Sequence, residues 1–151
     1  MAVLDVFEGM SERSRRLRYH GPKPRLPERE VDDLVDVGRY GREAVAAVDA
    51  VSGDVVGIAR FVRDDEDPHV AEVAFEVVDE CQSSGVGSRL VRELSGLAAR
   101  EGVARFRASV VAGNEPALAL LRRMGRVVAS EYVDGAYELV VELPALERAA
   151  A

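Results

Sequence analysis

Apolar residues recur along this chain at two spacings, and each spacing predicts one kind of element. Runs rich in valine and alanine with interleaved polar positions, bounded by turn-forming residues, are typical of half-buried strands. This pattern predicts six strands, at residues 43–50, 54–63, 70–78, 104–111, 126–132 and 136–143. Ser52-Gly53 and Asp134-Gly135 predict tight turns between neighbouring strands.

Other segments carry apolar residues at the spacing of one helix face. These predicted helices span residues 7–18, 26–37, 86–99 and 114–124. Ser11 and Asn114 are of the residue types that cap helix starts, and Gly125 is a typical helix stop. The order of elements predicts a single α/β domain over residues 1–151, with a frayed tail over residues 144–151.

Composition limits the classes of function. A length of 151 residues suits one domain, and the net charge of −7 disfavours a general nucleic-acid binder. No run approaches the roughly 20 apolar residues of a membrane span, and the first residues lack a signal-peptide pattern. A single cysteine, Cys81, excludes an internal disulfide and fits a cytoplasmic protein. We therefore expect neither a membrane nor a nucleic acid as partner.

The charge is unevenly distributed along the chain. Residues 11–30 hold seven basic and three acidic side chains, whereas residues 31–80 are acidic. The basic stretch is either a solvated surface segment or a patch that steers an anionic cofactor or partner. Residues 64–68 form an acidic loop beside His69, which we interpret as a solvated turn, with no metal site expected.

The most informative motif is Gln82-Ser83-Ser84-Gly85-Val86-Gly87, between a predicted strand and a predicted helix. Glycines at such a junction let backbone N–H groups approach an anion, and the helix dipole adds to the attraction. A P-loop would require a lysine in the motif, but the chain's only lysine is Lys23. A dinucleotide-binding turn would require a third glycine. The motif indicates a phosphate-bearing cofactor, with an ordinary strand-to-helix turn as the alternative.

The motif Gln-x-x-Gly-x-Gly resembles motif A of the GNAT N-acetyltransferases, whose loop binds the pyrophosphate of acetyl-CoA. Asn114-Glu115-Pro116-Ala117, followed by the helix that ends at Gly125, resembles motif B of the same family. Ala71-Glu72-Val73-Ala74-Phe75 resembles the catalytic strand of GNAT lysine acetyltransferases. Residues 7–18 are similar to the first helix of bacterial protein lysine acetyltransferases. The resemblance covers nearly the whole chain.

The resemblance implies the GNAT fold, a mixed central sheet of about six strands flanked by about four helices. The family's usual first strand has no counterpart here, which places residues 43–50 at or near a sheet edge and favours a homodimer. Many family members carry a tyrosine as general acid in the motif B helix, and Leu121 takes that place here. Ser83 and Ser84 replace the more usual glycine and basic residue of the loop.

The resemblance also implies a cofactor, acetyl-CoA, and a set of residues that bind it. Main-chain groups near Val77 and Val78 would pair with the pantetheine arm, and one backbone N–H would polarise the thioester carbonyl. The pyrophosphate would be held by Gln82, Ser83, Ser84, Gly85, Val86, Gly87 and Ser88. Asn114 would contact the CoA arm, cap its helix, or do both.

Acetyl transfer to an amine requires the neutral amine, so a carboxylate must take its proton. Glu72 matches the position of the family's base, and Glu76 is the second candidate, on the same face if the strand alternates without interruption. A bulge after about Phe75 would change that alternation. The general acid is not identified, although Tyr132 and Tyr137 are candidates.

Three functions are compatible with these residues. The first is an acetyl-CoA-dependent N-acetyltransferase that acts on a protein lysine. The second is the same chemistry on a small amine or an amino acid. The third is a non-catalytic domain that binds acyl-CoA as a sensor or interaction module, which the presence of Glu72 disfavours.

Overall fold

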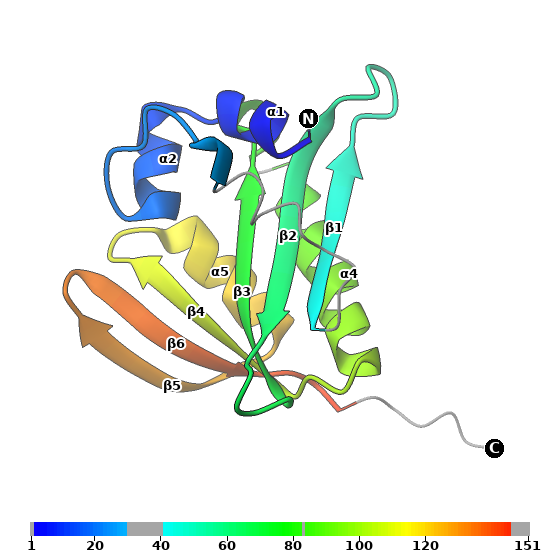
Figure 1. The fold of residues 1–151 in the computed structure, drawn as a ribbon, viewed down its shortest axis with the longest axis vertical. Helices are drawn as coiled ribbons and strands as arrows, with labels where there is room; N and C mark the ends of the chain where they lie inside the picture. Colours follow the sequence, from blue (N-terminus) through cyan, green and yellow to red (C-terminus); the bar gives the residue numbers. More distant parts are fainter. Residues whose placement is uncertain (1, 30–40, 83, 146–151) are drawn as a thin grey trace.

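Six strands form one mixed sheet in the computed structural model, which describes residues 2–29, 41–82 and 84–145 (Figure 1). The strands are β1 (Arg42–Val48), β2 (Val55–Arg63), β3 (Val70–Val77), β4 (Arg105–Val111), β5 (Arg126–Val133) and β6 (Ala136–Glu142). Their order is β1-β2-β3-β4-β6-β5, and only the β3–β4 pair is parallel. The six predicted strands are confirmed, and β1 lies at a sheet edge as expected. Pairing of two copies there stays a prediction.

Four α-helices are described: α1 (Ala2–Glu8), α2 (Glu12–Tyr19), α4 (Val86–Arg100) and α5 (Glu115–Met124). A short 3₁₀ turn, η1 (Asp79–Cys81), follows β3. The helices predicted over residues 86–99 and 114–124 are confirmed. Most of the helix predicted over residues 26–37, and most of the predicted tail, lie outside the described residues.

The single helix predicted over residues 7–18 is wrong, because the chain turns at Gly9 and Met10 between α1 and α2. Gly9 packs so closely that a Cβ on it would lie 2.5 Å from Cγ1 of Val78. Its carbonyl accepts a hydrogen bond from the N–H of Asp79 at 3.0 Å. Ser11 then caps the new helix, since its Oγ accepts from the N–H of Ser14 at 3.1 Å. These contacts with distant residues outweigh local helix propensity.

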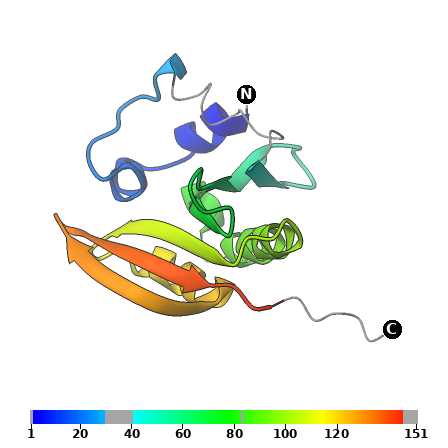
Figure 2. The ribbon, with the colours of Figure 1, turned by 60° about the horizontal axis from the view of Figure 1, so that its bottom comes forward.

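The two faces of the sheet carry different helices. Alternate side chains of a strand point to opposite faces, and β2 shows this directly. Ile58 belongs to a buried cluster with Val6 and Phe7 of α1, whereas Phe61 belongs to a larger cluster with Leu94 of α4. Helices α1 and α4 therefore cover opposite faces, as Figure 2 shows.

Strands β3 and β4 diverge soon after they begin to pair. Their register covers only Val70–Glu72 against Arg105–Arg107, and Figure 1 shows the two strands separating beyond that point beside α2 and α5. The β2–β3 register, in contrast, runs without a shift to the pair Gly57 and Val77. The bulge predicted after Phe75 is therefore absent from this pairing. Because β3 stays with β2 and β4 stays with β6, a cleft opens between them.

The carboxylate of Asp79, in the turn after β3, forms a hydrogen bond with the residue that precedes α2. Oδ1 of Asp79 accepts a hydrogen bond from the N–H of Ser11 at 2.9 Å. Burial raises the pKa of Asp79, but the hydrogen bonds from Ser11 outweigh it and bring the pKa below the ordinary value of 3.8. A folded-state pKa below the unfolded value adds stability that is complete above about pH 4 and is lost as the pH falls further.

We expect Asp79→Asn to remove this pH dependence. The free energy of unfolding should fall by less than about 1 kcal/mol at pH 7, because solvent screens a contact at this partly exposed site. The difference between the two proteins should shrink below pH 4, as measured by urea unfolding at a series of pH values. A difference that stays constant from pH 7 to pH 2 would contradict the role of the charge.

None of the described helices is long and apolar enough to cross a membrane.

Candidate active site

The cleft between β3 and β4 has a volume of about 800 Å³. Helices α2 and α5 and the start of α4 complete its walls. Most of the site residues predicted from the sequence line this one cavity, namely Glu72, Glu76, Val77, Gln82, Gly85, Gly87, Ser88 and Asn114. Segments up to about forty residues apart in the chain are thus brought together, as the sequence predicted.

The backbone of β3 faces the cleft at every second residue. The N–H of Val78 donates to the carbonyl of Val56 on the β2 side, at 2.9 Å, whereas the carbonyl of His69 accepts from Ala104 on the β4 side. With the uninterrupted β2–β3 register, odd-numbered residues therefore direct their N–H and C=O groups toward β4. Beyond Glu72 no β4 residue pairs with them, so this edge is open at Val73, Phe75 and Val77.

Val77 and Val78 differ in what they present to the cleft. Val77 lines it, and its carbonyl accepts a hydrogen bond from Nε2 of Gln82 at 3.1 Å. Val78 is buried in the cluster beneath α1, and its N–H is already donated to Val56. Of the two predicted positions, only Val77 offers backbone groups to a ligand. The sequence could not show which of the two valines has free backbone groups. That depends on which residues of β3 form hydrogen bonds with β2, since the remaining backbone groups face the cleft.

The start of α4 is an anion-binding arrangement. Gly85 is the N-cap in a left-handed conformation, with φ 88°. The first hydrogen bond back along the helix joins the N–H of Arg89 to the carbonyl of Gly85 at 3.1 Å. The N–H groups of Val86, Gly87 and Ser88 precede that bond and are available to an anion. Ser84 is exposed and donates its Oγ–H to the carbonyl of Cys81, and Ser83 lies outside the described residues.

Arg123 of α5 adds a cation to this arrangement. Its Nη1 donates to Oγ of Ser88 at 2.7 Å, at the positive end of α4. A guanidinium beside a helix N-terminus is unfavourable unless an anion lies between them. Arg123 and Ser88 line both the cleft and a second cavity of about 450 Å³, whose other lining residues come mainly from α4. Arg123 was not predicted as a site residue, because a charge at the end of a helix is its only signal in the sequence.

Glu72 and Glu76 lie on the same face of β3 and have different surroundings. Glu72 is exposed in the cleft, and in the part of the chain that the structure describes no hydrogen bond or ion pair engages its carboxylate. Glu76 is 4% exposed, and both of its oxygens are engaged by Arg60, with Oε1 3.2 Å from Nη2 and Oε2 3.4 Å from Nη1. Nε of Arg18 lies 2.8 Å from the same Oε1.

Arg60 and Arg18, which the sequence analysis did not place in the site, thus occupy the carboxylate of Glu76. Burial lowers the pKa of Arg60 from its ordinary value, and the charge of Glu76 opposes that shift. Glu76 is therefore a buried structural anion, whereas Glu72 is free to accept a proton.

Asn114 caps α5, since its Oδ1 accepts from the N–H of Ala117 at 3.4 Å, and it also lines the cleft. Leu121 is fully buried at the position where many family members carry a tyrosine as general acid.

Tyr132 and Tyr137 were the predicted candidates for the general acid. Their rings stack edge to face on the β5–β6 hairpin, and neither belongs to the described residues that line the cleft. These positions offer no general acid.

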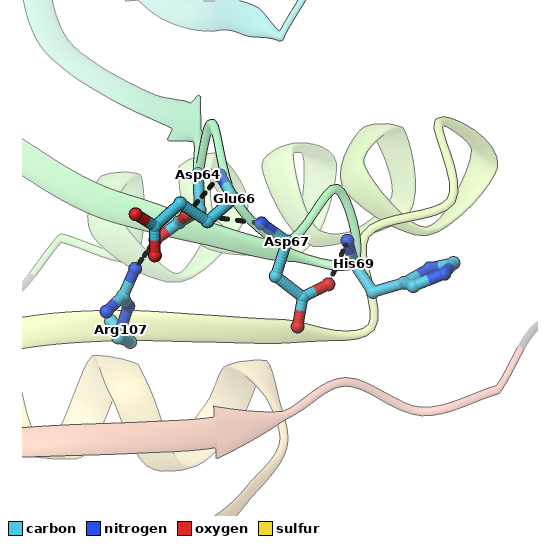
Figure 3. Close-up of polar contacts among 5 residues, drawn as sticks. All are labelled: Asp64, Glu66, Asp67, His69 and Arg107. Atoms are coloured by element: carbon cyan, nitrogen blue, oxygen red, sulfur yellow. Dashed lines mark hydrogen bonds and ion pairs between the residues drawn. The ribbon is translucent and has the colours of Figure 1, made fainter.

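The acidic loop is a hydrogen-bonded turn (Figure 3). Oδ1 of Asp64 accepts from the N–H groups of Glu66 and Asp67, and Asp67 accepts from the N–H of His69. The other oxygen of Asp64 pairs with Arg107 of β4. The described residues contain no group of three or more side chains placed to hold a metal ion.

An open strand edge that leads to an anion-binding helix start defines a domain that binds an extended, phosphate-bearing cofactor. Residues 10–125 match the Acetyltransferase (GNAT) family, and the chain belongs to this family. The family is one of acetyltransferases, for which acetyl-CoA is the acetyl donor. The predicted fold, family and cofactor are confirmed.

Individual relatives agree with this assignment. The chain is 41% identical over 75 residues to Acetyltransferase Pat of Mycolicibacterium smegmatis, a match that covers 50% of this chain and 22% of that protein. The GNAT domain of S. lividans PAT superposes with a TM-score of 0.82 at 25% identity, over 94% of this chain and 84% of that one. A Sinorhizobium meliloti phosphinothricin acetyltransferase, in complex with AcCoA, shares the fold at 17% identity and a TM-score of 0.74, over 95% and 85% of the chains.

Proposed function

We propose that this domain transfers the acetyl group of acetyl-CoA to a lysine side chain of a protein, with Glu72 as general base. The observation that carries the assignment of the base is the unengaged carboxylate of Glu72 in the cleft, four residues from a Glu76 that two arginines occupy. The acceptor class rests on the resemblance of residues 7–18 and 71–75 to segments of GNAT lysine acetyltransferases. The small-amine alternative has only a shared fold in its favour.

The base is needed because a lysine amine, with a pKa near 10.4, is almost wholly protonated at pH 7. Glu72 takes the proton, directly or through a water molecule, and the neutral nitrogen then forms a bond to the thioester carbonyl carbon. A backbone N–H on the open edge of β3 stabilises the developing oxyanion. As the C–S bond breaks, the sulfur leaves as a thiolate and takes up the second proton of the nitrogen, which gives the amide and the thiol of CoA. Little acid help is required, because a thiol has a pKa near 8.5.

The chain's own groups suit the donor along its length. Backbone groups of Val73, Phe75 and Val77 would pair with the pantetheine amides in the manner of an added strand. The N–H groups at the start of α4, with Arg123, would hold the pyrophosphate. The amide of Gln82 must then leave the carbonyl of Val77, which it occupies in this structure.

We expect Gly85→Ala to weaken acetyl-CoA binding about tenfold, because a left-handed alanine costs roughly 1–2 kcal/mol and shifts the loop. The space around Gly85 is open, so strain and not collision causes the loss. Gly53→Ala is the matched control, since Gly53 also has a positive φ, of 77°, and open surroundings, in the β1–β2 turn. Calorimetry should show weaker binding in the first variant only. Equal affinities in both variants would contradict the assignment of the loop.

The function is tested by incubating the protein with labelled acetyl-CoA and three kinds of acceptor: folded proteins, lysine peptides and free amino acids. Label in protein lysines supports the proposal. Label confined to small amines would replace it with the alternative.

A further inference from the structure

The guanidinium of Arg18 lies in the cleft without a hydrogen-bonded partner. Its Nε forms an ion pair with Oε1 of Glu76 at 2.8 Å without a hydrogen bond, and its Cζ lies 4.8 Å from the centroid of the Tyr19 ring. The side chain is 24% exposed. Within residues 2–29, 41–82 and 84–145, no acceptor receives a hydrogen bond from any of its five N–H groups. The donors therefore remain available to a ligand in the cleft.

Other arginines of the same helix have different surroundings. Arg15 donates to the carbonyls of Phe7 and Pro24, and Arg16 pairs with Glu12 one turn away. Only some of the basic stretch at residues 11–30 is therefore a solvated surface, and Arg18 is the arginine of α2 that lines the cleft.

The charges around Arg18 do not balance. Arg60 and Glu76 are 7% and 4% exposed and neutralise one another through two hydrogen bonds. Arg18 is ion-paired with the same carboxylate at 2.8 Å, so the group of two arginines and one glutamate keeps one net positive charge. A cation whose donors are unsatisfied in a partly desolvated cavity is most favourable with an anion beside it. The unmatched charge therefore points to an anionic group on the substrate.

We propose that Arg18 binds a carboxylate of the acceptor substrate, and hence that the acceptor is a primary amine with a carboxylate near it. A planar guanidinium matches a carboxylate through two parallel hydrogen bonds. A single negative charge suits the site, because Glu72 in the same cleft would repel a dianion. The proposal rests on the proposed function, since Glu72 places the amine.

The spacing on β3 favours one source of that carboxylate. The Cα atoms of Glu72 and Glu76 are roughly 13 Å apart along β3 at about 3.3 Å per residue, and the ion pair with Glu76 places Arg18 at the Glu76 end of that span. The α-amino and α-carboxyl groups of a free amino acid are attached to one carbon and do not reach that far. A lysine side chain that enters toward Glu72, with an aspartate or glutamate beside it in the acceptor chain, does. The favoured acceptor is therefore a lysine with an acidic neighbour.

The proposed carboxylate site is tested by measuring the binding of acceptor peptides to the protein saturated with CoA, which does not require acetyl transfer. The ligands are peptides with one lysine and an aspartate at each neighbouring position in turn, and the same peptides with asparagine instead. L-Lysine and L-lysinamide, which differ only in the α-carboxylate, form the corresponding pair of free amino acids. We expect calorimetry to give at least about tenfold tighter binding for one aspartate peptide than for its asparagine twin.

Two arginine variants locate the effect. Arg18→Gln should remove the preference for aspartate, whereas Arg13→Gln, which removes an exposed charge from the same helix outside the cleft, should keep it. Arg18→Lys keeps the charge and loses the planar fork, so it should retain only part of the preference. Circular dichroism and thermal unfolding of each variant identify any loss of the fold. If Arg18→Gln is unfolded, the intact Arg18→Lys variant decides the result.

The outcomes separate this proposal from the proposed function. Equal binding of both peptide types and of both amino acids, or a preference that Arg18→Gln and Arg18→Lys leave intact, overturns the role of Arg18. A preference limited to L-lysine over L-lysinamide, abolished by Arg18→Gln, supports Arg18 but replaces protein lysine with a free amino acid as the acceptor. An aspartate preference in the wild type with no acetylation of the same peptide supports the carboxylate site and contradicts the proposed activity.

Discussion

Replacement of Glu72 by glutamine is expected to lower kcat for acetyl transfer by about 100-fold or more at pH 7. The dissociation constant of acetyl-CoA should stay unchanged, because no described contact of the loop or of α5 involves this side chain. Glutamine keeps the size of glutamate and cannot take a proton. The acceptor amine must then lose its proton to water, and only a small fraction of the amine is neutral at this pH.

The deficit of Glu72→Gln should narrow as the pH rises. The neutral fraction of a lysine amine increases about tenfold per pH unit below its pKa of about 10.4, so the variant gains rate while the wild type changes little. Rates from pH 6.5 to 9.5, by release of free CoA thiol, check this. Glu131→Gln is the control, because Glu131 is also an exposed strand glutamate, on β5 and outside the cleft. A deficit that does not vary with pH would assign Glu72 a role other than general base.

Glu76→Leu is expected to lower the free energy of unfolding by about 3–5 kcal/mol. Glu76 is the anion between Arg60 and Arg18, and its removal leaves a buried guanidinium without a counter-charge. This loss of unfolding free energy is larger than the stability that the Arg60–Glu76 ion pair itself contributes. The difference arises because the arginine charge that remains is buried without a partner. Urea unfolding followed by circular dichroism measures the change.

The double variant Arg60→Met, Glu76→Leu is the matched control for that prediction. Removing both buried charges together leaves only Arg18, whose side chain is 24% exposed, without its counter-charge, so part of the lost stability should return. A double variant that is as unstable as Glu76→Leu would show that packing, and not the unpaired charge, is responsible. A loss of under about 1 kcal/mol in the single variant would contradict the buried pair.

Local patterns in the sequence predicted most of the fold. The strands and the two helices after β3 were located to within about two residues, because their apolar spacing, the Asn114 cap and the Gly125 stop agree with one another. The glycine loop and Glu72 were placed in one site for the same reason. In these segments the local sequence and the tertiary structure favour the same conformation.

Features set by partners from distant segments could not be predicted. The helix break at Gly9 depends on Val78 and Asp79, and the unavailability of Val78 depends on Val56. Glu76 matched Glu72 in strand, face and residue type, and only the arginines from β2 and α2 distinguish the two carboxylates. A single sequence does not show which segments will meet, so charge pairing across the sheet becomes visible only in the folded chain.

The alternation of β3 has a consequence for how such a domain can diversify. Odd-numbered residues present backbone atoms to the donor side of the cleft, whereas the side chains of Glu72, Ala74 and Glu76 face α2. Backbone groups are common to all amino acids, so a mutation at position 74, unlike one at the buried Glu76, alters the side chain on the acceptor side and leaves the donor contacts in place. Selection on acceptor specificity and selection on donor binding therefore act on different atoms of β3. The acceptor specificity of such a domain can change during evolution while it continues to bind the same donor.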